Sequence, residues 1–304
     1  MVQTAKHTSN KIKQDSASIL LQALCYILVG IFALLCLFPF VLMITSSFME
    51  EQEILTEGFK LIPSQFTVSA YEFLFRHPDS ILDAYGITIL ITIIGTAVGL
   101  FIMSMTGYVL NRKDCKYRNG ISFFIYFTTL FSGGLIPSYI LMVSYLKLKD
   151  NVLAMILPGL MSAWSIFLMR NFMKAIPDSL YESATIDGAG DFRIYWQIFL
   201  PLAIPSLATV GLFLALGYWN EWYNAMLYIQ TPSKYPLQYF LQKMVNQANV
   251  QQLIAQGIQV DVSDLPTQSV KMATAVVATG PVILFYPFVQ RYFVSGLTVG
   301  AVKG

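Results

Sequence analysis

The sequence predicts an all-α membrane protein with six transmembrane helices. Its 304 residues are 56% hydrophobic and only 12% charged, whereas soluble proteins carry about 25% charged residues. The apolar residues also gather in blocks that can cross a hydrocarbon core of about 30 Å, which takes about 20 helical residues. The net charge of +2 gives no indication of a nucleic-acid partner.

Six apolar blocks reach the length of a membrane span, and each contains Gly or Pro, which membrane helices tolerate. The expected spans are residues 23–48, 85–110, 121–146, 152–173, 200–222 and 273–293. The first block is longer than the apolar core of a secretory signal, roughly 7–15 residues, and no small-residue cleavage site follows it. We therefore expect a retained span, with a cytoplasmic tail over residues 1–22 and a transmembrane domain over residues 23–304.

Lysine and arginine indicate which loops face the cytoplasm, where these residues accumulate. They gather before the first span, between the second and third, and after the fourth: Lys6, Lys11, Lys13, Arg112, Lys113, Lys116, Arg118, Arg170, Lys174 and Arg193. The opposite loops hold fewer of them: Lys60, Arg76, Lys147 and Lys149. With six spans, all three basic segments lie on one side, so we expect both termini in the cytoplasm.

Two extracytoplasmic segments are long enough for more than a turn. Residues 50–84 are polar and acidic, and residues 230–272 are rich in Gln and Asn. They are either solvated connections or a surface that receives a delivered substrate or its carrier protein. The cysteines Cys25, Cys36 and Cys115 show neither a metal-binding spacing nor an extracytoplasmic partner, so we expect all three to be unpaired.

The cytoplasmic segment 177–201 predicts a helix, a break and a second helix. Pro177 suits a first helical position, and Ser179 with Glu182 has the spacing of a capping box. Gly188 and Gly190 are expected to end this helix. Its surface carries small residues that permit close approach by another protein: Ser183, Ala184, Gly188 and Ala189.

The second helix of this segment is expected to begin with Asp191 as its cap. Its aromatic residues follow helical spacing and predict one apolar face: Phe192, Tyr195, Trp196 and Phe199. Pro201 then opens the fifth span.

The same segment resembles the EAA loop of ABC importer permeases. That motif reads Glu-Ala-Ala, a Gly four positions later, nine residues, and Ile-x-Leu-Pro. The matching positions here are Glu182, Ser183, Ala184, Gly188, Ile198, Leu200 and Pro201. Ser183 is the one departure, and its small side chain should preserve packing.

The resemblance implies that the first helix is a coupling helix, which docks in a cleft of an ATPase subunit. It assigns the coupling contact to Glu182, Ser183, Ala184, Asp187, Gly188 and Pro201. Glu182 would pair with a basic residue of the ATPase, and Gly188 would allow the sharp turn. The alternative is that Glu182 only caps its own helix.

Three further runs are similar to the maltose-type sugar permease group: residues 131–137, which resemble permeases for complex oligosaccharides, residues 219–222, and residues 296–304. The resemblance implies a type I ABC importer permease that moves a carbohydrate, an oligosaccharide, across the bacterial cytoplasmic membrane. It also implies a heterodimer with a second homologous permease, two ATPase subunits that bind ATP and Mg, and an extracellular solute-binding protein. No cofactor and no catalytic residue are expected in this chain.

A polar and aromatic cluster near one membrane face is the candidate substrate path: Trp219, Asn220, Glu221, Trp222 and Asn224. Aromatic rings stack on sugar C–H faces, and polar residues in a span normally face a cavity or another helix. The alternative is an interfacial aromatic belt. Gly133 and Gly134 are expected to permit a bend or close packing rather than to contact sugar.

Two other function classes fit less well. The chain lacks a P-loop, so it cannot supply the ATPase itself. An ion-coupled secondary transporter is expected to carry ionisable residues near mid-membrane, and the middles of these spans carry none. An integral-membrane metalloenzyme has little support, because His7 and His77 are the only histidines and lie outside the spans.

Overall fold

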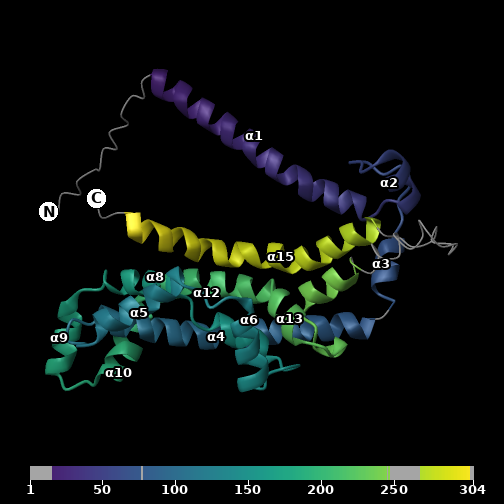
Figure 1. The fold of residues 1–304 in the computed structure, drawn as a ribbon. Helices are drawn as coiled ribbons and strands as arrows, with labels where there is room; N and C mark the ends of the chain where they lie inside the picture. Colours follow the sequence, from purple (N-terminus) through teal and green to yellow (C-terminus); the bar gives the residue numbers. More distant parts are fainter. Residues whose placement is uncertain (1–15, 77, 245, 247–267, 302–304) are drawn as a thin grey trace, which may run out of the picture.

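The computed structural model describes residues 16–76, 78–244, 246 and 268–301. Over these residues the regular structure is helical, apart from one isolated β-bridge between Met49 and Phe66. The long helices α4 (Pro78–Asn111), α12 (Ile204–Trp219) and α15 (Gln268–Ala301) run alongside one another, and α1 (Ser16–Ser46) diverges from them (Figure 1). The predicted all-α membrane fold is confirmed.

Among the residues that the structure describes, two single helices are long and apolar enough to cross a membrane, namely α4 and residues Leu20–Ser46 of α1. Three further stretches of the described chain qualify as bent pairs. They are Arg118–Leu130 with Leu135–Tyr145 at 114°, Leu153–Gly159 with Ala163–Met173 at 49°, and Asp191–Leu202 with Ile204–Trp219 at 82°. The third, fourth and fifth expected spans are therefore bent rather than continuous. The count of six spans stays a prediction.

The bent pairs are built from short helices. They comprise α5 (Arg118–Leu130), α6 (Leu135–Ile140), η1 (Leu141–Tyr145), α7 (Leu153–Ile156), η2 (Leu157–Gly159), α8 (Ala163–Met173), α10 (Asp191–Ile194), η3 (Tyr195–Phe199) and α11 (Leu200–Leu202). Gly134 lies at the sharpest bend with φ +85°, a conformation that glycine adopts without a Cβ penalty. Of the two roles expected for Gly133 and Gly134, a bend or close packing, the bend is observed and Gly134 makes it.

Helix α4 is the centre of the packed bundle and contacts both α8 and α12. Buried apolar side chains fill the space between the three helices: Met103, Leu110, Ile166, Met169, Val210 and Leu214. Small residues let the backbones approach closely, as is usual between membrane helices. A Cβ on Gly107 would lie 3.0 Å from the Cβ of Met169. The bundle therefore fixes α4 between two neighbours along its length.

Helix α1 lies apart from the bundle and meets α15 near one end only (Figure 1). No residue in the most apolar stretch of α1 is buried, which is compatible with a span that faces lipid or another subunit. The short helix α2 (Glu51–Glu57) lies where α1 meets α15, and it holds the start of α15 in place. The Glu51 carboxylate accepts hydrogen bonds from the backbone N–H groups of Gln268 and Ser269, at 2.8 and 3.0 Å. It thereby satisfies donors at the start of α15 that have no helical partner.

Candidate functional site

The segment 177–201 folds as the predicted helix, break and helix, at one end of the bundle (Figure 1). Its first helix, α9, runs from Asp178 to Ile186. Pro177 is the extended residue before the helix (φ −60°, ψ 133°) and not its first residue. Ser179 and Glu182 therefore lie inside the first turns, and the capping box predicted for them does not form within this described segment.

The break after α9 is made by Gly188, whose φ of +80° is the left-handed conformation that glycine favours. The Ala189 N–H donates to the Ala184 carbonyl across the turn at 2.9 Å, so this helix end is closed as predicted. Gly190 instead has a negative φ and precedes α10. Asp191 is the first residue of α10, and its carboxylate accepts from the Tyr181 hydroxyl at 2.9 Å. The prediction that Asp191 is the helix cap was wrong by one position.

The predicted coupling residues divide between two environments. Exposed residues of α9 and its turn form what we call the docking face: Glu182, Ser183, Ile186, Asp187 and Gly188. Ile186 is 86% exposed, an unusual position for a large apolar side chain beside charged residues. Ala184 points the other way and is buried against Tyr108 and Tyr195. Pro201 lies in α11 and is exposed.

Ile186 was absent from the predicted set. Its position one helical turn after Glu182 was the available sequence signal, because residues at i and i+4 share a helix face.

The aromatic stripe of the second helix divides in the same way. Tyr195 and Phe199 are buried and pack on Tyr108, with ring centroids 5.4 and 4.9 Å away. Phe192 and Trp196 are more than half exposed and stack on each other. The prediction of one apolar face was therefore only half right, since the π-helical turn at Tyr195–Phe199 shifts the register.

The loop between α4 and α5 contacts α9 through charged groups. The Lys113 ammonium lies 2.6 Å from the Asp178 carboxylate, and this ion pair holds the pKa of Asp178 below its usual value. Both side chains are largely exposed, so the pair contributes little to stability. It nevertheless places the basic loop directly beside the coupling segment.

The residues predicted for the substrate path do not line one common surface. Trp219 is half-buried, and its ring N–H donates to the Ala278 carbonyl of α15 at 3.4 Å. Beside it, the Tyr85 hydroxyl donates to the Val277 carbonyl at 3.0 Å. That carbonyl has no helical donor because Pro281, four residues later, lacks an N–H. Trp219 and Tyr85 thus bind α15 to α4 and α12.

The other members of that set turn toward the chain or toward solvent. The Glu221 carboxylate accepts from the backbone N–H and the side-chain amide of Asn224, both at 2.8 Å. Asn220 is exposed and its amide donates to the Leu216 carbonyl. Trp222 is exposed and lies edge-on to Tyr223. A role for these residues in a substrate path stays a prediction.

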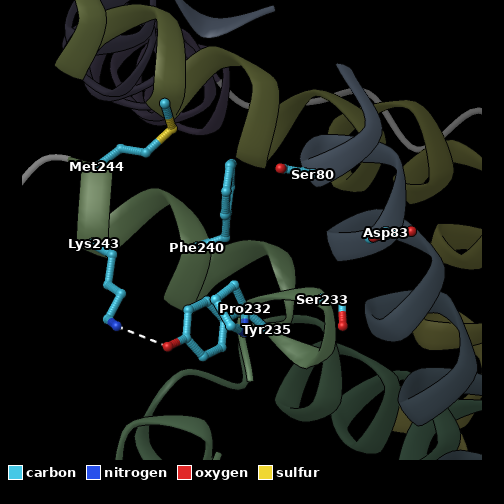
Figure 2. Close-up of a pocket in the computed structure, with 8 residues that line it drawn as sticks. All are labelled: Ser80, Asp83, Pro232, Ser233, Tyr235, Phe240, Lys243 and Met244. Atoms are coloured by element: carbon cyan, nitrogen blue, oxygen red, sulfur yellow. Dashed lines mark hydrogen bonds between the residues drawn. The ribbon is translucent and has the colours of Figure 1, made fainter. Parts of the chain in front are cut away.

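A pocket of about 420 Å³ opens between the start of α4 and the segment 232–244 (Figure 2). It is lined by Ser80, Asp83, Pro232, Ser233, Tyr235, Phe240, Lys243 and Met244. The Lys243 ammonium donates to the Tyr235 hydroxyl at 2.8 Å and lies 4.5 and 5.4 Å from the ring centroids of Tyr235 and Tyr239. The hydrogen bond raises the pKa of Lys243, so its charge is retained at neutral pH. The pocket offers hydroxyls, aromatic rings, the Lys243 cation and the Asp83 carboxylate together.

Within the part of the chain that the structure describes, no group of three His, Cys, Asp or Glu side chains could hold a metal ion. The cysteines Cys25, Cys36 and Cys115 are free, as expected.

Comparisons with known proteins agree on one kind of relative. The model of the family described as "binding-protein-dependent transport system inner membrane component" matches residues 13–299. The polygalacturonan/rhamnogalacturonan transport system permease of Bacillus subtilis is 40% identical over 94% of this chain and 99% of its own. An arabinooligosaccharides transport system permease of Halalkalibacterium halodurans is 28% identical over 90% of this chain and 93% of its own.

A solved structure is similar as well. It is that of a bacterial ABC transporter involved in the import of the acidic polysaccharide alginate. The match has a TM-score of 0.79 at 30% identity, and it covers 93% of this chain and 99% of the other.

Proposed function

The chain belongs to the inner membrane components of binding-protein-dependent transport systems, and from that premise we propose that α9 is the surface through which an ATPase drives carbohydrate import. The chain is a non-catalytic permease subunit of an ABC transporter, and ATP hydrolysis belongs to a separate ATPase. Such a permease acts in a complex with the ATPase and a binding protein. Membership of this family argues against the ion-coupled alternative.

The docking face of α9 supports this proposal. It presents a carboxylate, a small hydroxyl and the exposed Ile186 side by side, and a central apolar anchor with a polar rim is typical of protein interfaces. The buried Ala184 fixes α9 to the bundle, so a force on the docking face reaches the spans. We assign Glu182, Ser183, Asp187 and Gly188 to contact with the ATPase, while the buried Ala184 supports the loop from within. The exposed Pro201 stays a candidate for the same contact.

We further propose the arrangement of the whole transporter. A second, homologous permease completes a heterodimer, and two ATPase subunits bind ATP and Mg. Residues 1–22 and both termini lie in the cytoplasm. The Lys and Arg distribution supports this orientation, and so does Figure 1, in which the N-terminal end of α1 and the C-terminal end of α15 lie at the same end as α9.

We propose an oligosaccharide that contains acidic sugars as the substrate class. One similar protein is named for the transport of polygalacturonan and rhamnogalacturonan, and another belongs to an importer of the acidic polysaccharide alginate. The pocket in Figure 2 supports the same class, because an ammonium can pair with a sugar carboxylate and Phe240 can stack on a sugar face. Trp219, Asn220, Glu221, Trp222 and Asn224 stay candidates for the path beyond it.

Reconstitution of the complex in liposomes tests both proposals. We expect ATP-dependent uptake of oligogalacturonate, with a neutral oligosaccharide of equal length taken up less. Glu182→Arg should abolish uptake and retention of the ATPase, because it reverses a charge on the docking face. Glu72→Arg is the matched control and should leave both unchanged, because it reverses the charge of an exposed carboxylate that lies outside the docking face. Uptake that is unaffected by Glu182→Arg would contradict the assignment of α9.

A further inference from the structure

We propose that Arg112, just beyond the cytoplasmic end of α4, is a positioning residue that ties the coupling helix α9 to α4 and transmits its movement. The inference rests on the proposed role of α9 in docking the ATPase. It concerns a different step, which is how a displacement of α9 reaches the bundle. A residue that only stabilised the fold would not change how a displacement of α9 is passed to the bundle.

The Arg112 side chain is held between the α4–α5 loop and α9. It is only 14% exposed, and its Nη2 lies 2.9 Å from Oδ1 of Asp114. The flat guanidinium group lies over the ring of Tyr181, on α9. Its main chain is also fixed, because the Arg112 N–H donates to the Val109 carbonyl at 3.2 Å and so prolongs the last turn of α4. One residue therefore contacts α9 with its side chain and continues α4 with its backbone.

Tyr181 extends this contact to both halves of the coupling loop. Its hydroxyl donates to Oδ1 of Asp191 at 2.9 Å, and Oδ2 of Asp114 lies 3.4 Å from it. The hydrogen bond from Arg112 holds the pKa of Asp114 below its usual value, so that carboxylate is ionised at neutral pH. The four side chains form what we call the Arg112 clamp: Arg112, Asp114, Tyr181 and Asp191. The clamp joins α4, α9, α10 and the loop before α5.

The chemistry of arginine explains why this contact can transmit movement. A guanidinium group stacks flat on an aromatic ring and binds a carboxylate at the same time, which an ammonium group cannot reproduce. The Arg112 side chain is also shielded from water far more than that of the neighbouring Lys113, at 14% against 79% exposed, although its partner carboxylate Asp114 is 59% exposed. Because α4 packs along α8 and α12, a displacement of its end is passed to the centre of the bundle.

The clamp is a second connection between α9 and α4, in addition to their apolar packing. Ala184 already lies in one buried cluster with Tyr108 of α4 and with Tyr195. That packing resists compression of α9 against the bundle. The clamp is directional and polar, so it also pulls the end of α4 when α9 moves away with the ATPase. Loss of the clamp should therefore leave docking intact and weaken the link between ATP hydrolysis and transport.

The reconstituted full complex tests this inference with Arg112→Gln. We expect assembly and ATP hydrolysis close to wild type, while the amount of sugar imported per ATP falls by roughly five-fold or more. Arg112→Lys, which keeps the charge and loses the flat stack, should fall in between. Lys116→Gln is the matched control, because it removes an equal charge from the same loop beside Tyr117, and it should keep the wild-type ratio.

Two results would overturn the clamp. One is a wild-type ratio of sugar to ATP in Arg112→Gln. The other is additivity: if Arg112 acts through Tyr181, Arg112→Gln in a Tyr181→Leu background should cause little further loss, whereas a full second loss shows that they act independently. If Arg112→Gln fails to assemble, the same ratio is measured for Arg112→Lys, and an unchanged ratio there overturns the proposal. A wild-type complex that imports no sugar with ATP contradicts the proposed function instead.

Discussion

The phenol ring of Tyr218 occupies the space that a Cβ atom on Gly95 would need. Three ring atoms of Tyr218 would lie within 3 Å of that Cβ, and the Tyr218 hydroxyl would lie 2.7 Å from a Cβ on Gly159. The hydroxyl also donates to the Ile156 carbonyl at 2.8 Å. The side chain of α12 is thus inserted into a slot between α4 and η2, and two glycines form the walls of that slot.

Gly95→Ala should therefore destabilise the bundle. The added methyl group forces Tyr218 out of the slot, and overpacking of this kind costs about 1–3 kcal/mol. Thermal unfolding in detergent measures the effect. Gly86→Ala is the matched control on the same helix, because a Cβ there meets nothing within 4 Å, and its melting temperature should stay near wild type. Equal melting temperatures for the two variants would show that the ring is not confined as described.

The slot also indicates where sequence reasoning was sufficient and where it was not. Composition and block length were enough for an all-α membrane fold, and the glycine at 188 was enough for the end of α9. The pairing of Tyr218 with Gly95 and Gly159 was not predictable, because the three are far apart in sequence and hydropathy does not encode contact. The bend at Ala203 was missed for a similar reason, since a hydropathy average runs through it.

The coupling segment shows the same division. Its exposed Glu182 and Ser183 follow from the motif, whereas the inward orientation of Ala184 depends on packing against Tyr108 of another helix. The sequence identified Arg112 only as one of the positive charges that indicate the cytoplasmic side of the membrane. Arg112 and Tyr181 are 69 positions apart in the chain, and a count of charges does not show which residues are in contact.

Ile186→Asp should remove the ATPase from the purified complex without unfolding the permease. Ile186 is 86% exposed, so it contributes little to the stability of the chain by itself. If it anchors the docking face, its loss costs more than about 2 kcal/mol of binding, as at other interface hot spots. Co-purification measures binding, and the melting temperature of the isolated permease is the control. An unchanged ratio of ATPase to permease would show that Ile186 is not part of the contact.

Asp150 should hold its own loop and the loop around Lys234 together over a wide pH range. Its carboxylate accepts from the Lys234 ammonium at 2.8 Å and from the backbone N–H of Thr231 at 2.9 Å. The Lys234 contact first, and the Thr231 contact second, hold the pKa of Asp150 far below its usual value. A lowered folded-state pKa stabilises the protein fully above the unfolded value of about 3.9, and the effect is lost as the pH falls through the folded-state pKa.

Asp150→Asn tests this assignment, because it removes the charge and keeps a side chain that tolerates the positive φ of 57°. We expect faster limited proteolysis of the loop around Lys234 at every pH from about 3.5 to 8, with a difference from wild type that does not change over that range. Glu72→Gln, an exposed carboxylate on the same predicted side, should have no effect. A difference that shrinks as the pH falls from about 5 through the ordinary aspartate pKa of about 3.9 would contradict the lowered pKa.

Trp219 and Asn220 should respond differently to substitution, although the sequence suggested one role for both. The Trp219 ring lies 6.4 Å from that of Tyr85, and its N–H donates to the Ala278 carbonyl of α15. Trp219→Ala should therefore lower the melting temperature, since removal of a large packed aromatic costs about 3–5 kcal/mol. Trp219→Phe should recover most of that loss. Asn220→Ala should leave stability unchanged, because Asn220 is exposed.

Uptake measured with these variants separates packing from a substrate path. If Trp219 serves only α15, Trp219→Phe transports sugar at the wild-type rate once the amount of folded complex is equalised. If Trp219 also lines the path, uptake falls although the melting temperature is recovered, because phenylalanine has no ring N–H to donate to the sugar. Asn220→Ala gives the second comparison, since a fall in uptake without any change in stability can only come from the exposed amide. Wild-type uptake in both variants would leave Trp219 and Asn220 without a role in the substrate path.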